Sequence, residues 1–237
     1  MVDVRDEVLE RISGNVKKVL EAIRAACDRS GRSPEEVKLV AVTKTVDLER
    51  IQAAILSGVR VFGENYIQEA REKISAIAKP VEWHFIGHLQ RNKAKYAVKL
   101  FDMIETVDNI KLAAELQKRA EKLSKVQPVL VQVNISGEET KSGISPTELP
   151  ELLKFMTKST SLEFKGLMTM PPYFEDPENA RPYFVRLREL RDEMKNRFPN
   201  LSFEELSMGM SGDFAVAIEE GATIVRVGTA IFGERRT

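Results

Sequence analysis

Short runs of apolar and β-branched residues alternate with segments whose apolar residues recur every three or four positions along almost the whole chain. The first pattern predicts buried strands and the second predicts amphipathic helices. The predicted strands are residues 37–44, 59–62, 81–86, 101–106, 129–135, 162–169, 201–207 and 222–227. The predicted helices are residues 4–29, 47–57, 65–78, 90–99, 108–124, 145–157, a long helix after 179, and 211–220.

Regular alternation of strands and helices predicts a parallel sheet. About eight such units in 237 residues predict an α/β fold of the closed (β/α)8, or TIM barrel, type. An open doubly wound sheet is the alternative, and it is disfavoured because no Gly-x-Gly-x-x-Gly follows the first strand. No linker or shift in composition interrupts the chain, so we expect a single domain over 1–237. We expect residues 1–30 to form an extra helix that packs on the barrel and plugs its lower end.

Composition narrows the class of protein. Lys plus Arg and Asp plus Glu both number 36, so no basic excess indicates nucleic acid or a membrane surface as a partner. The single Cys27 has no partner for an intramolecular disulfide. The charged first residues do not resemble a signal peptide, and no apolar run is long enough to span a bilayer. We therefore expect a cytoplasmic protein, monomeric, with a dimer left open.

Lys44 is the first residue whose position suggests chemistry, because it follows the apolar run 39–42. Lysine is rarely fully buried unless it is paired. An amine at the end of a buried strand therefore either reaches solvent or has a chemical role. Removal from water favours the neutral form of an amine, which can form a Schiff base with a carbonyl. On this segment alone both interpretations stay open.

The ends of the other predicted strands also carry polar residues. Functional sites of TIM barrels lie where strands end and the following loops begin. The residues at these ends are Lys44, Asn65, His88, Thr106, Asn134, Thr169, Ser207 and Arg226. Polar residues follow strand ends in any fold, so most of these positions are weak evidence for a site. Lys44, Asn134 and Arg226 are the most informative, because they follow strongly apolar runs.

Two loops rich in small residues follow the last two predicted strands. Residues 208–213 include Ser211 and Gly212, and the second loop begins with Gly228 and Thr229. Barrels often bind phosphate in the loops after strands seven and eight, where glycine admits a close approach and backbone N–H groups face the anion. Ordinary helix caps would explain either loop alone. The two loops together predict a phosphate site.

Arg226 ends the last predicted strand, and two roles are open to it. It could pair with a neighbouring carboxylate such as Glu64. Alternatively, a lysine amine, a phosphate cradle and an arginine at one mouth suit pyridoxal 5′-phosphate. Arginine stays protonated and can only donate, so it would leave the pyridine nitrogen unprotonated and make the ring a poorer electron sink.

Other candidate residues are weaker. His84 and His88 lie four apart on a strand and loop without a third ligand, so we expect no metal site and a core or mouth role for His84. Asp213 is interpreted as a first-turn helix charge. Lys141 lies in the loop after the fifth strand, which we interpret as a solvated tip rather than a lid.

Several segments in order resemble the pyridoxal phosphate homeostasis proteins, a family similar to the barrel domain of alanine racemase. The segments are Ala41-Val42-Thr43-Lys44, Phe62-Gly63-Glu64-Asn65-Tyr66, His84-Phe85-Ile86-Gly87-His88-Leu89-Gln90, Val133-Asn134-Ile135-Ser136-Gly137, Lys141-Ser142-Gly143, Gly166-Leu167-Met168-Thr169, Leu206-Ser207-Met208-Gly209-Met210-Ser211 and Val225-Arg226-Val227-Gly228-Thr229. The resemblance covers nearly the whole chain.

The resemblance implies that Lys44 holds pyridoxal phosphate as a Schiff base. It implies a phosphate site formed by Ser211, Gly212, Gly228 and Thr229, with Arg226 facing the pyridine nitrogen. It also implies that the ring is lined by Asn65, Asn134 and Met210. The implied role is in vitamin B6 and amino-acid balance, in which the protein binds the cofactor and hands it on to apo-enzymes.

An amino-acid racemase is the alternative function. Two-base racemisation needs a base on each face of the substrate, and in alanine racemases the second base comes from a further β domain of a partner subunit. The sequence ends at Thr237, just after the last predicted strand, and Tyr66 is the nearest internal candidate for that base. We therefore expect binding without turnover. A phosphate-binding barrel of sugar metabolism is a third possibility.

Overall fold

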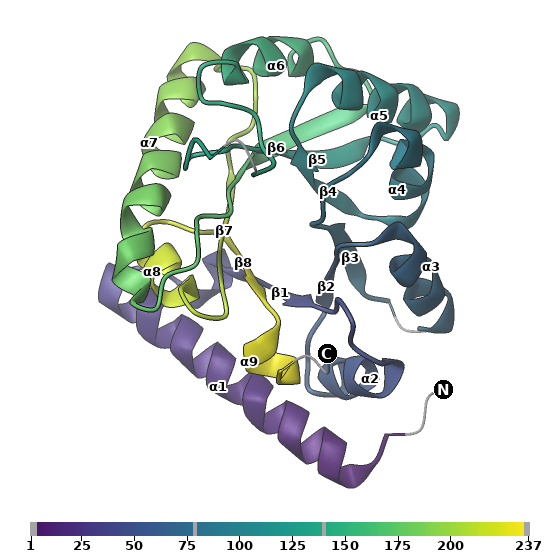
Figure 1. Ribbon diagram of the computed structural model, residues 1–237, viewed down its shortest axis with the longest axis vertical. Coiled ribbons are helices and arrows are strands. Elements are labelled where there is room, and N and C mark those ends of the chain that lie inside the picture. Colours follow the sequence, from purple (N-terminus) through teal and green to yellow (C-terminus); the bar gives the residue numbers. More distant parts are fainter. Residues whose placement is uncertain (1–3, 78–79, 139–140, 235–237) are drawn as a thin grey trace.

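The structure is a computed structural model that describes residues 4–77, 80–138 and 141–234. Eight parallel strands close into a barrel in chain order, which confirms the predicted α/β TIM barrel (Figure 1). The strands are β1 (Lys38–Val42), β2 (Val61–Glu64), β3 (Glu82–Phe85), β4 (Met103–Val107), β5 (Gln127–Gln132), β6 (Leu162–Met168), β7 (Glu205–Met210) and β8 (Ile224–Val227).

Helices form a ring outside the strands, and each strand is followed by one of them (Figure 1). They are α2 (Leu48–Leu56), α3 (Ile67–Ala76), α4 (Ala94–Leu100), α5 (Ile110–Lys122), α6 (Leu149–Met156), α7 (Arg181–Arg197), α8 (Phe214–Glu219) and α9 (Thr229–Phe232). Short 3-10 helices are η1 (Pro34–Glu36), η2 (Arg91–Lys93) and η3 (Pro177–Ala180). No helix in the described part of the chain is long and apolar enough to cross a membrane.

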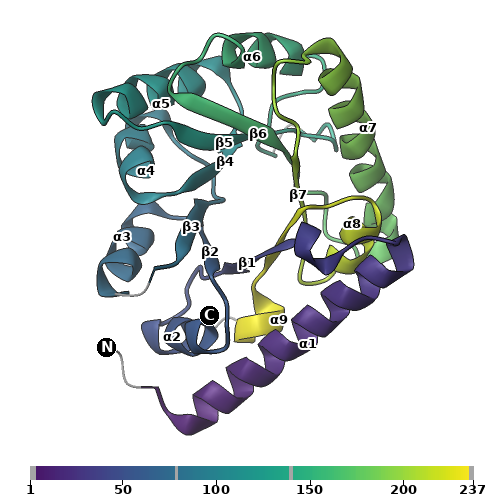
Figure 2. The same cartoon turned by 180° about the vertical axis from the view of Figure 1, so that it is seen from behind.

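The first helix, α1 (Asp6–Ser30), lies along the outside of the ring, as Figure 2 shows. It packs against α2, α8 and α9. Its apolar stripe, including Ile12, Val16 and Ile23, is buried in these contacts. The expectation that this helix plugs the lower end of the barrel was therefore wrong. The stripe matches the apolar surface of neighbouring helices rather than the strand ends.

The first strand is shorter than predicted and ends at Val42, two residues before Lys44. Thr45 adopts a left-handed conformation with φ of 62°, which a strand does not accommodate. Lys44 therefore lies in a tight turn between β1 and α2.

The interior of the barrel holds an apolar cluster with polar groups beside it. The cluster consists of Val40, Val61, Met103, Leu130, Met168 and Ile224. The buried polar side chains of the strands include His84, Glu105, Ser207 and Arg226. A filled interior is typical of TIM barrels and leaves the mouth as the place for a ligand.

Candidate functional site

A cavity of about 240 Å³ lies at the carboxyl ends of β7 and β8. It brings together six of the predicted site residues, which are Met210, Ser211, Gly212, Arg226, Gly228 and Thr229. Val42 at the end of β1 also lines it. The late-strand loops that suggested a phosphate site therefore share one cavity with the arginine.

Ser211 connects the two small-residue loops. Its Oγ accepts hydrogen bonds from the backbone N–H groups of Gly228 at 3.1 Å and Ala230 at 3.3 Å. These two N–H groups thus converge on one oxygen at the edge of the cavity. An anion oxygen could be bound by the same kind of donors, because backbone N–H groups without a helical partner need an acceptor.

Asp213 takes a different role from the first-turn helix charge that the sequence suggested. Its Oδ1 accepts a hydrogen bond from the backbone N–H of Met210 at 2.6 Å, and the residue lines the cavity. Burial raises the pKa of the Asp213 carboxyl above its ordinary value. Asp213 therefore ties the loop after β7 to the start of α8.

Arg226 enters the cavity from a buried position, with 3% of its surface exposed. Nη1 donates to Ser207 Oγ at 2.5 Å, and Nη2 donates to the carbonyl oxygen of Thr169 at 2.8 Å. The guanidinium has five N–H groups, so these contacts leave others for a ligand. Burial lowers the pKa of Arg226 from its ordinary value. The ion pair with Glu64 that we considered for it is wrong, because Glu64 pairs with another residue.

The partner of Glu64 is Lys73 of α3, whose Nζ lies 2.5 Å from Glu64 Oε1. The same ammonium group lies 2.9 Å from Glu69 Oε1. Glu64 is fully buried and also accepts from Thr43 Oγ1 at 2.8 Å. Burying charges is costly unless they are paired and hydrogen-bonded, and the charges of Glu64 and Lys73 are both. This cluster contacts the turn that contains Lys44.

Lys44 is half-buried, and its Nζ lies 5.1 Å from the centre of the Tyr66 ring. It is not among the residues that line the 240 Å³ cavity. The strand register places it at the same mouth, since Val42 pairs with Gly63 and Ala41 pairs with Val227. Two residues further along, Lys44 lies between the loop after β2 and the loop after β8.

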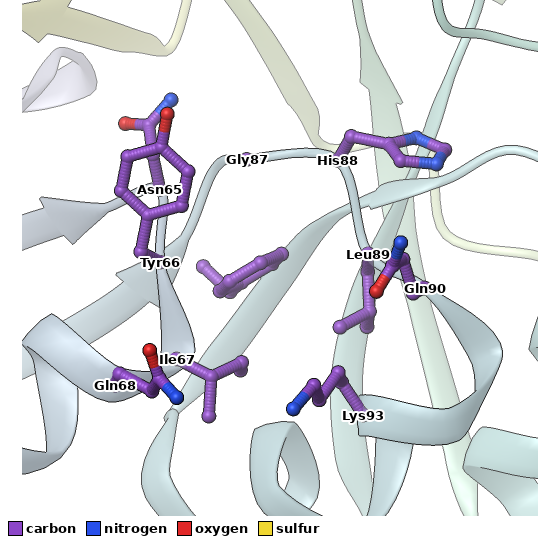
Figure 3. A pocket seen from close by; sticks show the side chains of 10 residues that line it. Asn65, Tyr66, Ile67, Gln68, Gly87, His88, Leu89, Gln90 and Lys93 are labelled. Carbon is purple, nitrogen blue, oxygen red and sulfur yellow. The ribbon is translucent and has the colours of Figure 1, made fainter.

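Asn65 lines a separate pocket of about 470 Å³ between the loops that follow β2 and β3. Figure 3 shows Asn65 and Tyr66 on one side of this pocket and Gln90 and Lys93 on the other. The loops approach closely at Gly87, where an added Cβ would lie 2.2 Å from the Asn65 carbonyl oxygen. This pocket and the 240 Å³ cavity share no lining residue, although Lys44 contacts the Tyr66 ring at the rim of the pocket.

Asn134 is occupied within its own loop. Its Oδ1 accepts from Ser136 Oγ at 2.9 Å and from the backbone N–H of Gly137 at 3.0 Å, and its Nδ2 donates to the carbonyl oxygen of Glu138 at 2.9 Å. The structure therefore places Asn134 at the barrel mouth as the organiser of the loop after β5. It does not place Asn134 in the lining of the 240 Å³ cavity.

Two aromatic residues of the loop after β6 complete the cavity, and they were not predicted from the sequence. Tyr173 and Phe174 line it, and Tyr173 is 84% exposed. Their position at a strand-to-helix loop was the available signal, because that is where barrel sites form. A tyrosine and a phenylalanine in a polar loop could have been included on this ground.

Comparison with known proteins identifies the family. Residues 16–236 match the family of the alanine racemase N-terminal domain. A pyridoxal phosphate homeostasis protein of Aquifex aeolicus is 50% identical over 228 residues, covering 96% of this chain and 98% of the relative. The protein of that name in Escherichia coli K12 is 41% identical over 232 residues, covering 94% of this chain and 97% of the relative.

Solved structures agree with this assignment. PipY of Synechococcus elongatus PCC7942, with pyridoxal phosphate bound, has 36% identity and a TM-score of 0.80, covering 90% of this chain and 99% of PipY. An alanine racemase of Clostridium difficile shares the fold at 13% identity and a TM-score of 0.74, covering 99% of this chain and 61% of that enzyme. The resemblance seen in the sequence motifs is confirmed. The chain belongs to the alanine racemase N-terminal domain family and, within it, to the pyridoxal phosphate homeostasis proteins.

Proposed function

We propose that this chain binds pyridoxal 5′-phosphate at the mouth of its barrel and acts in the homeostasis of that cofactor. The observation that carries the proposal is the cavity in which Ser211, Gly228 and a buried Arg226 meet. Its lining offers backbone N–H groups, hydroxyl groups and a guanidinium to a ligand. The relatives' names and the cofactor bound to PipY support the same assignment.

We assign the phosphate to Ser211, Gly212, Gly228 and Thr229. Two N–H groups there already converge on the Ser211 hydroxyl, which supports this placement. Phosphate oxygens are stronger acceptors than a hydroxyl, because hydrogen bonds to charged groups are about twice as strong as neutral ones.

We assign the pyridine nitrogen of the cofactor to Arg226, which lines the cavity. Two N–H groups of its guanidinium are bound by Ser207 and Thr169. Met210 lines the same cavity, and we place it against the ring. Asn65 and Asn134 stay proposed neighbours of the ring, because both lie at this mouth.

We assign the covalent attachment to Lys44. When bound, the cofactor supplies an aldehyde that condenses with a lysine amine to form a C=N bond and release one water. Lys44 lies in a turn between the loops after β2 and β8, beside the cavity and against Tyr66. The Tyr66 ring and the fixed turn limit where the amine can lie.

We infer that the protein binds and hands on the cofactor rather than catalysing turnover, with pyridoxal phosphate-dependent apo-enzymes as recipients. Racemisation needs a second base on the face opposite Lys44. Tyr66, the internal candidate, packs against the amine of Lys44 itself. Purified protein with bound cofactor should therefore not convert L-alanine to D-alanine at enzyme-like rates, and conversion at such rates would support the racemase alternative.

The visible spectrum tests cofactor binding directly. Wild-type protein mixed with pyridoxal phosphate should develop the absorption band of a protein-bound Schiff base, and Lys44→Ala should not. Lys93→Ala and Lys141→Ala are matched controls that should retain the band. A colourless wild-type protein that binds no cofactor would favour a phosphate-binding barrel of another kind.

A further inference from the structure

A chain of buried polar groups continues behind Arg226 into the barrel. Ser207 Oγ, which accepts from Arg226 Nη1, donates to Glu105 Oε2 at 2.5 Å. Glu105 Oε1 lies 2.6 Å from His84 Nδ1. The exposed fractions of these four residues are 3% or less, and each contacts the next directly.

Ser207 joins two opposite charges that have no direct contact. Its single hydroxyl accepts a hydrogen bond from the guanidinium and donates one to the carboxylate, so the position of its proton is defined. The apolar cluster that includes Val40 and Leu130 lies in the same interior. In such surroundings hydrogen bonds are stronger than in water, and an unpaired polar group is costly.

His84 lies at the far end of this chain of polar groups, in contact with Glu105. Burial alone would lower the pKa of His84, but the 2.6 Å contact with Glu105 and the nearby Glu82 carboxylate outweigh this and raise that pKa above its ordinary value. The pKa of Glu105 is lowered, because His84, Arg226 and Ser207 outweigh the effect of burial. Glu82 Oε2 lies 3.8 Å from His84 Nε2 and 3.8 Å from Lys38 Nζ. Glu82 and Lys38 are the first residues of β3 and β1, at the amino-terminal end of the barrel.

We propose that Ser207, Glu105 and His84 are positioning residues for Arg226. They hold one edge of the guanidinium by Ser207 Oγ, while the Thr169 carbonyl oxygen holds Nη2. The plane of the guanidinium is thereby fixed, and its remaining N–H groups are presented to the cavity. This inference rests on the proposed function, because the group to be recognised there is the pyridine nitrogen of the cofactor.

The test uses pyridoxal phosphate labelled with ¹⁵N in the ring and bound to the full-length protein. In the wild type, the ¹⁵N chemical shift should be that of an unprotonated, hydrogen-bonded nitrogen. Ser207→Ala should move the ¹⁵N chemical shift toward that of a ring nitrogen that accepts no hydrogen bond from the protein. It should also raise the dissociation constant for pyridoxal phosphate about tenfold. Ser207→Thr keeps the hydroxyl and should restore both values. Glu105→Gln keeps the shape but removes the charge, and should give an intermediate shift.

Gln127→Leu is the matched control, because Gln127 is another fully buried polar residue on a strand and donates to the Asp102 carbonyl oxygen. It should lower stability and leave the ¹⁵N shift unchanged. The inference is overturned if Ser207→Ala retains the wild-type shift, or if Gln127→Leu changes it equally.

A readout in the absence of cofactor separates this inference from the proposed function. The Arg226 Nε–Hε resonance of the free protein should be sharp and slow to exchange in the wild type and in Ser207→Thr. It should be broadened or averaged in Ser207→Ala. A wild-type protein that binds no pyridoxal phosphate would contradict the proposed function alone, while an unchanged Arg226 resonance in Ser207→Ala would contradict the positioning role.

Discussion

The ammonium group of Lys73 donates to the main-chain carbonyl oxygen of Thr43 at 2.6 Å and so holds the residue directly before Lys44. The residue directly after it is held too, because the backbone N–H of Thr45 donates to Glu69 Oε1 at 2.7 Å. Lys73 bonds to Glu69 as well. One buried ion cluster therefore fixes both peptide groups that flank Lys44, including the left-handed turn at Thr45.

Replacing Lys73 with methionine should strongly destabilise the protein. The change leaves Glu64 buried without its cation, and removing one partner of a buried pair costs about 3–5 kcal/mol of the free energy of unfolding. Lys99→Met is the control, because Lys99 lies on the exposed face of α4. It should change the free energy of unfolding by less than about 0.5 kcal/mol. Urea unfolding of the two variants checks this. Equal stability of both variants would show that the buried Lys73–Glu64 pair does not stabilise the fold.

The fold could be predicted because its signals are local. The apolar run 129–135 predicts a strand, and the amphipathic pattern of residues 4–29 predicts a helix. The alternation of such strands and helices along the chain leaves few possible topologies. The position of α1 could not be predicted in this way. Its apolar stripe predicts that one face of the helix is buried. Whether that face packs on the ring of helices or on the end of the barrel depends on the shapes of surfaces that form only in the folded chain.

The phosphate assignment predicts a selective effect of Ser211→Ala. The variant loses the oxygen on which the N–H groups of Gly228 and Ala230 converge, together with a hydroxyl donor for a ligand. Affinity for pyridoxal phosphate should fall by about tenfold, the effect of one hydrogen bond to a charged group. Affinity for pyridoxal, which has no phosphate, should be nearly unchanged. Titrations of both ligands provide the measurement, and an equal loss for both would contradict the assignment.

The buried pair of His84 and Glu105 predicts a pH-dependent stability. The pKa of His84 is raised in the folded protein, so protonation of His84 stabilises the fold below its unfolded pKa near 6.5. That contribution is lost as the pH rises through the folded pKa. His84→Gln should therefore lower the free energy of unfolding by about 1–3 kcal/mol at pH 6 and by less at pH 9.

Urea unfolding of the wild type and His84→Gln between pH 5 and pH 9 measures this difference. At still lower pH the lowered pKa of Glu105 has the opposite effect, because its stabilising charge is lost as the pH falls through that pKa. A difference between the two proteins that stayed constant up to pH 9 would argue against a protonated His84 in the folded state.

The close approach of the loops after β2 and β3 predicts that Gly87→Ala is harmful. Its Cβ would lie 2.2 Å from the Asn65 carbonyl oxygen, which is backbone and cannot move alone. We expect a loss of about 1–3 kcal/mol in the free energy of unfolding, the usual cost of overpacking. Gly14→Ala is the control, because it lies within α1 with no atom within 4 Å, and it should stabilise by about 0.5–1 kcal/mol. Thermal unfolding of both variants distinguishes strain at Gly87 from a general glycine effect.

The candidate site was predicted in part from the sequence. Ser211, Gly228 and Arg226 could be selected because small residues and an arginine follow the last two strands. The partners of Arg226 could not be predicted, since Glu105 and Ser207 lie 102 positions apart and meet only across the closed barrel. The Lys73–Glu64 pair was missed for a related reason, because a lysine on an amphipathic helix is usually solvated and nothing local marks this one as buried.

We propose that Lys44 holds the cofactor. The most direct measurement is reduction of the wild-type complex with sodium borohydride, which makes a Schiff base permanent, followed by proteolysis and mass spectrometry of the peptides. We expect one pyridoxyl phosphate label, on Lys44, and no label on the other lysines at equal loading. A label on Lys93 or Lys141 with Lys44 unmodified would contradict it.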